Sequence, residues 1–284
     1  MSLNSNRINK RVCFICGAPH SGSTLLGLIL GSHSVCFYAG EANKIKFLHS
    51  KNAYKDSMCK VCGRNCPVWG DFYFDDSIDL YEQLSVKTQK PFIIDSTKKP
   101  SWLTTQIKNL EEKDVKLYLI YLFRDGRAVI NSRLRKYQSS DPMDVIDNWI
   151  HHMKQTNMIY QNFPEEKIKI QYKTLALNPS KTIKKLTDIL ELDFEPSMVE
   201  FFRHEHHPLG GNTGTQSLIV KAQKDSQFTT PIQLSERNKY YYKNHPLEIK
   251  YDQRWKEELD PEILNLFNKK AGEFNNNLLN NKIP

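Results

Sequence analysis

Short apolar runs alternate with longer amphipathic segments along most of the chain. This alternation is typical of βαβ units, in which helices connect the strands of a parallel sheet. The run from Leu117 to Leu122 is apolar or aromatic at every position, as expected for a central strand buried on both faces. The strands predicted in this way are residues 12–16, 35–38, 92–94, 116–122 and 167–170. The chain is therefore predicted to be an α/β protein with a central parallel sheet flanked by helices.

Amphipathic segments between and after these strands predict the helices. Two of them have clear start signals, because Asn178-Pro179 and Asp260-Pro261 each place an N-cap residue before a proline at the first helical position. The predicted helices are residues 23–30, 126–136, 142–162, 180–190, 196–203 and 261–271.

Four segments lack this periodicity within what we expect to be a single domain spanning residues 1–284. The polar, cysteine-bearing stretch 43–90 is predicted to be an insertion on the core. Residues 204–237, rich in Gly, Thr, Gln and His, are predicted to form a long loop. Residues 1–10 and 273–284 are predicted to be terminal tails.

Composition narrows the class of protein. Hydrophobic residues make up 39% and charged residues 25% of the 284, which is ordinary for a globular chain. No run of about 18 apolar residues occurs, so no membrane span is predicted. The first ten residues are polar and lack the apolar stretch of a signal peptide, which favours a cytoplasmic location.

The net charge of +8 arises from 40 Lys and Arg against 32 Asp and Glu. A moderate positive excess suits an anionic ligand, because a cleft concentrates the field of the surrounding charges. The basic residues are spread along the chain, without a basic arm or an aromatic–basic repeat. No nucleic-acid partner is therefore expected.

Six cysteines fall into two groups. Three lie in apolar contexts and are predicted to be buried free thiols: Cys13, Cys16 and Cys36. The others, Cys59, Cys62 and Cys66, form a C-x2-C-x3-C group in a polar segment. A metal, a disulfide and plain thiols are all open for this group. A structural zinc site needs four ligands, and the fourth ligand is not evident. The nearest histidine is His49. A reducing compartment disfavours the disulfide, so free thiols and no metal ligand are predicted.

The segment Gly17-Ala-Pro-His-Ser-Gly-Ser-Thr24 joins the first predicted strand to the first predicted helix. Free backbone N–H groups and the helix dipole make such a helix N-terminus an anion site. The spacing is that of a P-loop, G-x4-G-K-[ST], but Ser23 stands where the lysine would be. A nucleoside triphosphatase needs that lysine against its phosphates. The segment therefore predicts a P-loop NTPase-like three-layer architecture that holds an anion without ordinary ATP chemistry.

A second motif follows the central strand. Arg124 stands at the carboxyl end of that strand, where open α/β sheets place their ligands. Ser132 lies about two helical turns further on. Together they could hold one phosphate through a forked arginine contact and a hydroxyl donor. The alternative is a surface arginine that pairs with Asp125, and an exposed serine.

These two motifs together resemble the sulfotransferase family, most closely its tyrosylprotein (Golgi-type) and bacterial branch. In that family the first motif binds the 5′-phosphosulfate of 3′-phosphoadenosine 5′-phosphosulfate (PAPS), and the second binds its 3′-phosphate. The similarity covers about residues 11–267. It continues in weaker segments: Asp95-Ser-Thr-Lys98, Tyr172-Lys-Thr-Leu175, Gly211-Asn212, and Trp255 with Leu259.

The resemblance assigns roles to individual residues. Glu41 corresponds to a catalytic glutamate and Lys98 to a lysine that contacts the sulfuryl group. His20 stands where the family usually has lysine or arginine, and we expect it to donate to the leaving phosphate. The alternatives are a structural Glu41, a solvated Lys98 and a His20 that only lines the loop. The expected PAPS-binding residues are Pro19, His20, Ser21, Gly22, Ser23, Thr24, Leu25, Arg124, Ser132, Tyr172 and Asn212.

We thus expect a sulfotransferase that moves a sulfuryl group from PAPS to an acceptor hydroxyl or amine by in-line displacement, leaving PAP. Such transfer is mainly positioning and charge stabilisation, so no metal is expected to be required. The segment His204-Glu-His-His207 lacks the spacing of a metal motif. The acceptor could be a small molecule, a glycan or a peptide. Alternatives are a P-loop kinase of a small molecule and a catalytically weak PAPS- or PAP-binding protein.

Overall fold

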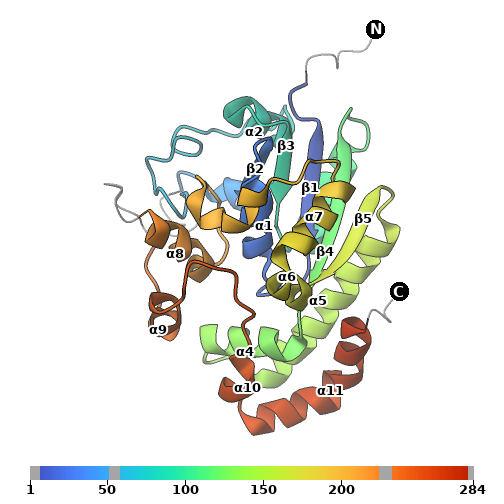
Figure 1. Ribbon diagram of the computed structural model, residues 1–284. Coiled ribbons are helices and arrows are strands. Elements are labelled where there is room, and N and C mark those ends of the chain that lie inside the picture. Colours follow the sequence, from blue (N-terminus) through green and yellow to red (C-terminus); the bar gives the residue numbers. More distant parts are fainter. Residues whose placement is uncertain (1–6, 51–57, 224–231, 281–284) are drawn as a thin grey trace.

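The structure is a computed structural model that describes residues 7–50, 58–223 and 232–280 (Figure 1). Five strands form one sheet in the order β2-β3-β1-β4-β5, and every neighbouring pair is parallel. Their bounds are β1 Arg11–Cys16, β2 Cys36–Gly40, β3 Phe92–Asp95, β4 Lys116–Phe123 and β5 Glu166–Gln171. The predicted α/β class with a central parallel sheet is confirmed, and each predicted strand overlaps an observed one.

Successive side chains of the strands enter two separate cores, one on each face of the sheet. In β1, Val12 and Phe14 belong to one core, and Cys13 and Ile15 belong to the other. This alternation follows from the two-residue period of a strand. Because both of its faces are buried, the interior strand β4 is apolar or aromatic after its first residue, as its sequence predicted. The edge strand β5 instead alternates Lys with Ile and is only partly buried.

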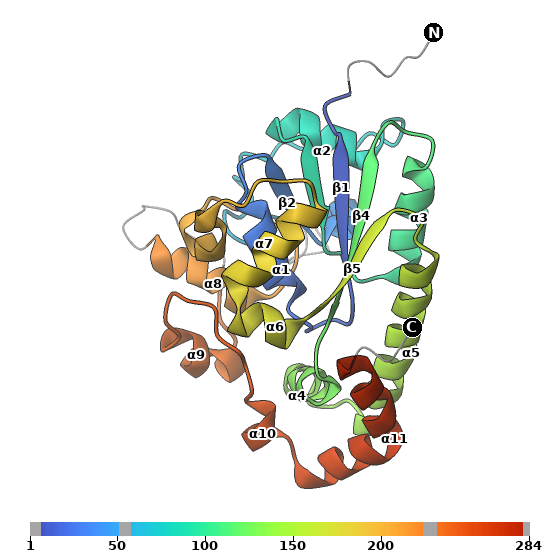
Figure 2. The ribbon, with the colours of Figure 1, turned by 45° about the vertical axis from the view of Figure 1, so that its right-hand side comes forward.

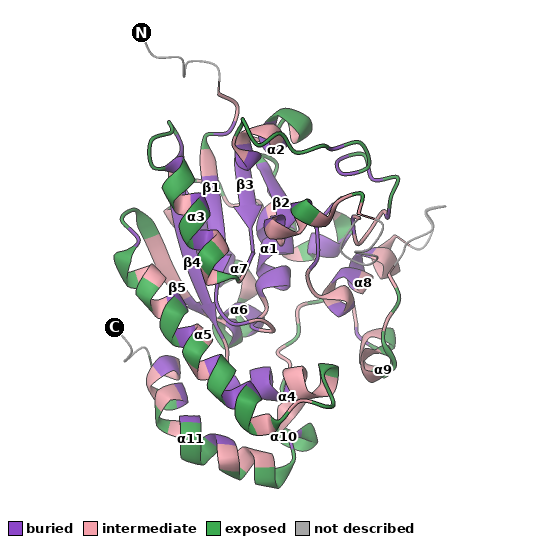
Figure 3. Ribbon diagram, turned by 180° about the vertical axis from the view of Figure 1, so that it is seen from behind, coloured by how far each residue is buried: buried purple, intermediate pink, exposed green. Residues whose placement is uncertain are grey.

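Helices cover both faces, which gives three layers (Figures 1 and 2). The Cys13 face is covered by α1 Ser23–Gly31, α6 Tyr172–Leu177, α7 Pro179–Ile189, the 3-10 helix η2 Pro196–Arg203 and α8 Thr213–Ala222. The Val12 face is covered by α2 Leu80–Thr88, α3 Pro100–Leu110 and α5 Pro142–Asn162. The remaining elements are η1 Ala42–Phe47, α4 Gly126–Lys136, α9 Glu236–Lys243, α10 Trp255–Glu258 and α11 Pro261–Leu279. Figure 3 shows buried strands behind helices whose outer faces are exposed. Among the described helices, none has the length and apolarity that a membrane span requires.

Two segments without periodicity contain regular structure in their described parts. The described parts of residues 43–90 lie between the neighbouring strands β2 and β3, and they supply Trp69 and Tyr81 to the Val12-face core. In residues 204–237 we expected a long loop, but α8 occupies residues 213–222. The side chain of Asn212 caps that helix by accepting from the Thr215 N–H at 2.8 Å. The polar composition of this segment gave no helical signal, although this cap and a buried face stabilise α8.

The prediction of tails is also wrong for the described ends of the chain. Arg7 forms an ion pair with Asp79, and Asn9 is fully buried. At the other end, α11 continues to Leu279, and Asn275 is 1% exposed. The asparagine-rich sequence suggested fraying, but one of these asparagines makes buried hydrogen bonds.

Asn275 fastens α11 to the start of α4. Its Oδ1 accepts a 2.7 Å hydrogen bond from the Gly126 N–H, and its Nδ2 donates to Asp125 Oδ1 at 3.3 Å. Asp125 is the N-cap of α4, the helix that carries Ser132. The end of the chain therefore supports the helix of the second motif.

We predict that Asn275→Ala lowers the free energy of unfolding by about 1–3 kcal/mol, because the buried Gly126 N–H loses its acceptor. The neighbouring Asn276 is exposed, so Asn276→Ala should stay within about 0.5 kcal/mol of the parent protein. Urea denaturation followed by circular dichroism measures both values. Equal, small effects of the two substitutions would mean that the end of α11 frays.

Candidate active site

A cavity of about 590 Å³ lies at the carboxyl-terminal edge of the sheet. All residues predicted from sequence to bind the donor or to act in catalysis line it, with the exception of Ser21. The Ser21 side chain is fully buried, and its backbone N–H donates to the Ala18 carbonyl at 3.2 Å. The structure therefore brings the two sequence motifs into one site but leaves Ser21 outside it.

The turn between β1 and α1 requires glycine at two positions. Gly17 has a φ of +132°, and a side chain there would meet the Leu122 carbonyl oxygen at 2.1 Å. Gly22 has a φ of +102°, and a side chain there would meet the Tyr172 ring at 2.6 Å. L-residues with side chains rarely adopt such φ values. The resulting tight turn presents the N-terminus of α1, with Ser23 and Thr24, to the cavity.

Arg124 follows β4 and lies opposite this turn. Its Nη2 donates to the Asp252 carbonyl at 2.9 Å and lies 3.3 Å from the Asp252 carboxylate. Its Nη1 donates to the His20 carbonyl at 3.2 Å, and its guanidinium lies 4.5 Å from the centre of the Tyr172 ring. The alternative ion pair between Arg124 and Asp125 is not observed. Asp125 instead pairs with Arg127 at 2.6 Å.

Asp252 is a site residue that sequence reasoning missed. Burial by itself would raise the pKa of the Asp252 carboxyl. The hydrogen bonds from Arg254 and the charge of Arg124 outweigh burial and hold this pKa well below its usual range. The carboxylate therefore stays ionised and fixes both guanidinium groups. The charged and aromatic run just before Trp255 was the available signal for these residues.

His20 and Ser132 meet inside the cavity. Ser132 Oγ lies 3.0 Å from His20 Nδ1, in hydrogen-bonding range, and His20 adopts a left-handed φ of +71°. Burial, followed by the charges of Lys136 and Arg133, lowers the pKa of His20 to about 3. The imidazole is thus neutral near pH 7, unlike the lysine or arginine usual at this position in the family. A bound anion would act in the opposite direction and raise this pKa.

Glu41 and Lys98 form an ion pair at 2.7 Å, each just beyond its strand, β2 and β3. Lys98 Nζ also donates to the Ser96 carbonyl at 2.9 Å. The Gly210 backbone lies against Glu41, since a side chain at Gly210 would meet Glu41 Oε2 at 2.9 Å. These contacts orient a carboxylate and an ammonium group beside the glycine turn.

The cysteine group has a fourth member that the sequence analysis missed. The sulfur atoms of Cys59, Cys62 and Cys66 and a ring nitrogen of His207 all lie within 4.8 Å of one another. His207 comes from the His204–His207 segment, which we had dismissed as a metal motif. His49 is not part of the group, because its Nε2 bonds to the Phe72 carbonyl at 3.0 Å. Local spacing could not reveal a ligand that lies so far along the chain.

The strand, glycine turn and helix, together with the arginine at the end of the neighbouring strand, form a P-loop-like anion site in an α/β fold. A family model described as "Sulfotransferase family" matches residues 13–196. The chain therefore belongs to the sulfotransferase family and is a sulfotransferase.

Individual relatives are distant but agree with this assignment. The "Putative protein-tyrosine sulfotransferase" of Caenorhabditis briggsae is 23% identical over 208 residues, which cover 71% of each chain. Among solved structures, the sulfotransferase domain of the Synechococcus PCC 7002 olefin synthase has a TM-score of 0.57 at 17% identity, over 85% of this chain and 96% of that one. Mouse sulfotransferase SULT7A1, solved in complex with PAP, has a TM-score of 0.50 at 11% identity, over 98% and 90%. The structural likeness confirms the P-loop-like fold.

The neutral His20 makes stability depend on pH. In the unfolded chain the imidazole takes up a proton near its ordinary pKa of 6.5, whereas in the folded protein it does so near 3. The free energy of unfolding therefore has its full value above pH 6.5 and decreases as the pH falls toward 3, because the unfolded chain then binds one proton more than the folded protein. We predict that acidification through this window lowers the free energy of unfolding of the parent protein relative to that of His20→Asn, by up to about 1.4 kcal/mol per pH unit.

Asparagine is the appropriate replacement because it tolerates a left-handed φ and does not titrate. Denaturant unfolding of both proteins at a series of pH values measures the difference. A difference that stays constant from pH 7 to pH 4 would show that His20 titrates alike in both states.

Proposed function

We propose that the cavity binds PAPS and transfers its sulfuryl group to an acceptor hydroxyl. The observation that carries the proposal is that the glycine turn and the Arg124–Ser132 pair line one cavity, with the Glu41–Lys98 pair beside the turn. Two separate anion-holding ends suit a ligand with two phosphate-bearing ends, such as an adenosine 3′-phosphate 5′-phosphosulfate. The PAP complex of the related mouse enzyme supports the same donor class.

The charge of the cavity lining also favours a polyanionic ligand. Acidic lining residues are Glu41, Glu248 and Asp252. Basic lining residues are Lys44, Lys60, Lys98, Arg124, Arg135, Lys136, Arg237, Lys250 and Arg254. Cations that converge on a partly enclosed space attract anions more strongly than the same charges on an open surface.

At the 5′ end, backbone N–H groups from Gly22 to Leu25 and the hydroxyls of Ser23 and Thr24 would hold the phosphosulfate. Thr24 Oγ1 already accepts a 2.9 Å hydrogen bond from the Asn212 N–H, which brings Asn212 to this end of the cavity. Donors fixed before the substrate arrives stabilise charge without a reorganisation cost.

At the 3′ end, Arg124 and Ser132 would bind the phosphate. Asp252 already orients the Arg124 guanidinium, so little side-chain freedom is lost on binding. The Tyr172 ring is held by a hydrogen bond from its hydroxyl to the Lys250 carbonyl at 3.2 Å. It lies against the Arg124 guanidinium and would help to keep that group in place.

Glu41 would remove the acceptor proton as the sulfuryl group transfers. Lys98, now paired with Glu41, would exchange that partner for the sulfuryl oxygens that gain charge in the transition state. His20 would contact the bridging phosphate oxygen, and its protonation would then follow the charge of the bound donor.

For the acceptor, we propose the phenolic hydroxyl of tyrosine in a peptide. The support is the shared name of two relatives, the nematode protein-tyrosine sulfotransferases. Small phenols, sugars and amines are the alternative outcomes of the same assay. A kinase of a small molecule is disfavoured because Ser23 occupies the position of the P-loop lysine.

Donor binding can be tested without an acceptor. We predict that PAP raises the melting temperature, whereas ATP with Mg²⁺ does not. Arg124→Ala and Ser132→Ala should weaken PAP binding, the arginine change by about ten- to hundred-fold, because a charge-assisted hydrogen bond is lost. Isothermal titration calorimetry measures the affinity. Arg203→Ala, at an exposed arginine paired with Glu200, is the control that should bind PAP normally. Stabilisation by ATP–Mg²⁺ but not by PAP would refute the donor assignment.

Removal of the proposed base separates catalysis from binding. We expect Glu41→Gln to lower kcat by about 10²–10⁴-fold, as for a lost general base, while PAP affinity stays within a few-fold. Transfer of ³⁵S from labelled PAPS to tyrosine-containing peptides, phenols, sugars and amines provides the rate. Glu200→Gln, at an exposed glutamate, is the matched control. Undiminished turnover by Glu41→Gln would remove this residue from the mechanism.

A further inference from the structure

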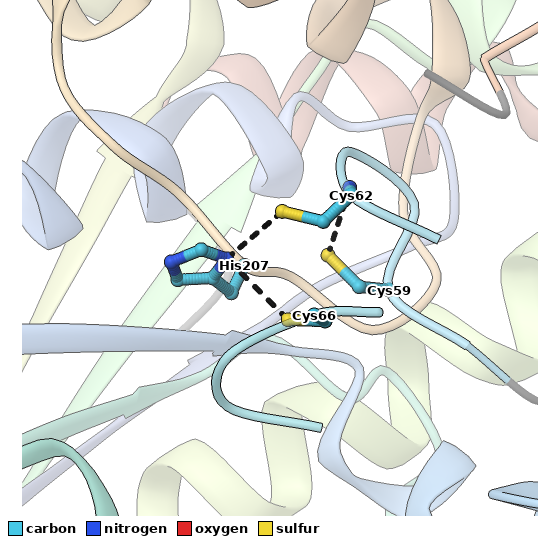
Figure 4. A group of neighbouring side chains, drawn as sticks. All are labelled: Cys59, Cys62, Cys66 and His207. Carbon is cyan, nitrogen blue, oxygen red and sulfur yellow. Dashed lines mark hydrogen bonds between the residues drawn. The ribbon is translucent and has the colours of Figure 1, made fainter. Parts of the chain in front are cut away.

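Three sulfur atoms and one ring nitrogen converge at a place that the transfer reaction does not use. Figure 4 shows the side chains of Cys59, Cys62, Cys66 and His207 turned toward one another. His207 Nδ1 lies 3.2 Å from Cys62 Sγ and 3.4 Å from Cys66 Sγ. Donor atoms around a tetrahedral zinc ion, with Zn–S of about 2.3 Å and Zn–N of about 2.0 Å, are about 3.5–3.8 Å apart. Since all four donors lie within 4.8 Å of one another, they need to move by at most about 1 Å to enclose one ion.

The local backbone is shaped to direct two sulfurs to the same side. Gly63 adopts a φ of +77°, and its N–H donates to the Cys59 carbonyl at 3.1 Å, which closes a tight turn. Within this turn the Cys62 N–H points at Cys59 Sγ, at 3.5 Å. The turn therefore holds the Cys59 sulfur close to the backbone of Cys62.

The surroundings of His207 are those of a metal ligand. With Nδ1 directed at the sulfurs, its other ring nitrogen, Nε2, bonds to Glu205 Oε1 at 3.0 Å. A carboxylate on the remote nitrogen fixes the ring orientation and strengthens the ligand. The His207 carbonyl accepts from Trp69 Nε1, so the backbone is held as well.

Neither a disulfide nor a catalytic thiol accounts for this arrangement. All six cysteines are free thiols in the structure, and a disulfide would leave one of the three sulfurs beside the histidine unused. A nucleophilic cysteine needs access to substrate, but Cys59 is fully buried, Cys66 is 3% exposed, and none of the four residues lines the cavity. Four protein ligands in a closed, soft donor set are typical of structural zinc.

We propose that Cys59, Cys62, Cys66 and His207 bind one Zn²⁺ ion that has a structural role. The ion would join the β2–β3 crossover to the segment that follows η2, two parts of the chain far apart in sequence. Binding of the ion would release the thiol protons, because the metal ligands are thiolates and a neutral imidazole.

The joined segments lead directly to the active site. Leu209, two residues after His207, bridges to both Cys59 and Gly40, and its carbonyl accepts from the Glu41 N–H at 2.7 Å. Three residues beyond Leu209, the Asn212 N–H donates to Thr24 Oγ1. The zinc ion would therefore hold the backbone around the proposed base and the phosphosulfate end, without touching the substrate.

The test is the metal content of the whole 284-residue chain, measured by inductively coupled plasma mass spectrometry after purification without chelator. We expect one zinc per chain. His207→Ala should lose it, whereas His207→Cys, which supplies a fourth thiolate, should keep it. The control is His204→Ala, since His204 bonds to the Ser197 carbonyl outside the group. It should bind zinc like the parent protein.

A second measurement covers the case in which His207→Ala fails to fold. Exchange of the bound ion for Co²⁺ in the parent protein should give the intense visible bands and the sulfur-to-metal charge transfer of a tetrahedral site with three thiolates. Absence of metal together with three thiols that react readily in the native protein would overturn the proposal, as would iron in place of zinc. These readouts do not depend on sulfuryl transfer, so they stand apart from any failure of the proposed function.

Discussion

The parallel arrangement of the sheet is the constraint on which the site depends. Because all five strands run the same way, their carboxyl ends meet at one edge. Each strand ends at or just before a group that lines the cavity: the glycine turn after β1, Glu41 after β2, Lys98 after β3, Arg124 after β4 and Tyr172 after β5. The parallel register of β1 with β3 and β4 thereby also sets the distances between these groups.

The cations at this edge are oriented by acidic partners as well as being in excess. Asp252 holds Arg124 and Arg254, and Glu41 holds Lys98, so the cations are oriented before a ligand arrives. The same surroundings keep His20 neutral, since burial and nearby cations oppose its protonation. A polyanionic donor would change each of these balances at once, which couples its binding to the protonation of His20 and to the release of Lys98.

The fold and most of the site could be predicted from the sequence because their signals are local. Apolar runs marked the strands, the spacing of glycines marked the turn before α1, and the position of Arg124 at the end of an apolar strand placed it at the ligand edge. Contacts between distant segments left no such signal. His207 joins three cysteines more than 140 residues earlier, and Asn275 completes the start of α4 from within an asparagine run that resembled a tail. The protonation of His20 likewise depends on burial and on charges that only the folded chain brings together.

The central claim is that one cavity holds both phosphate-bearing ends of an adenosine donor, and a crystal structure of the protein with PAP tests it most directly. The account predicts the 5′-phosphate on the backbone amides of residues 22–25, and the 3′-phosphate between Arg124 and Ser132. PAP bound at another place would contradict the account. So would PAP in this cavity with its 3′-phosphate remote from Arg124 and the Arg124–Asp252 ion pair unchanged.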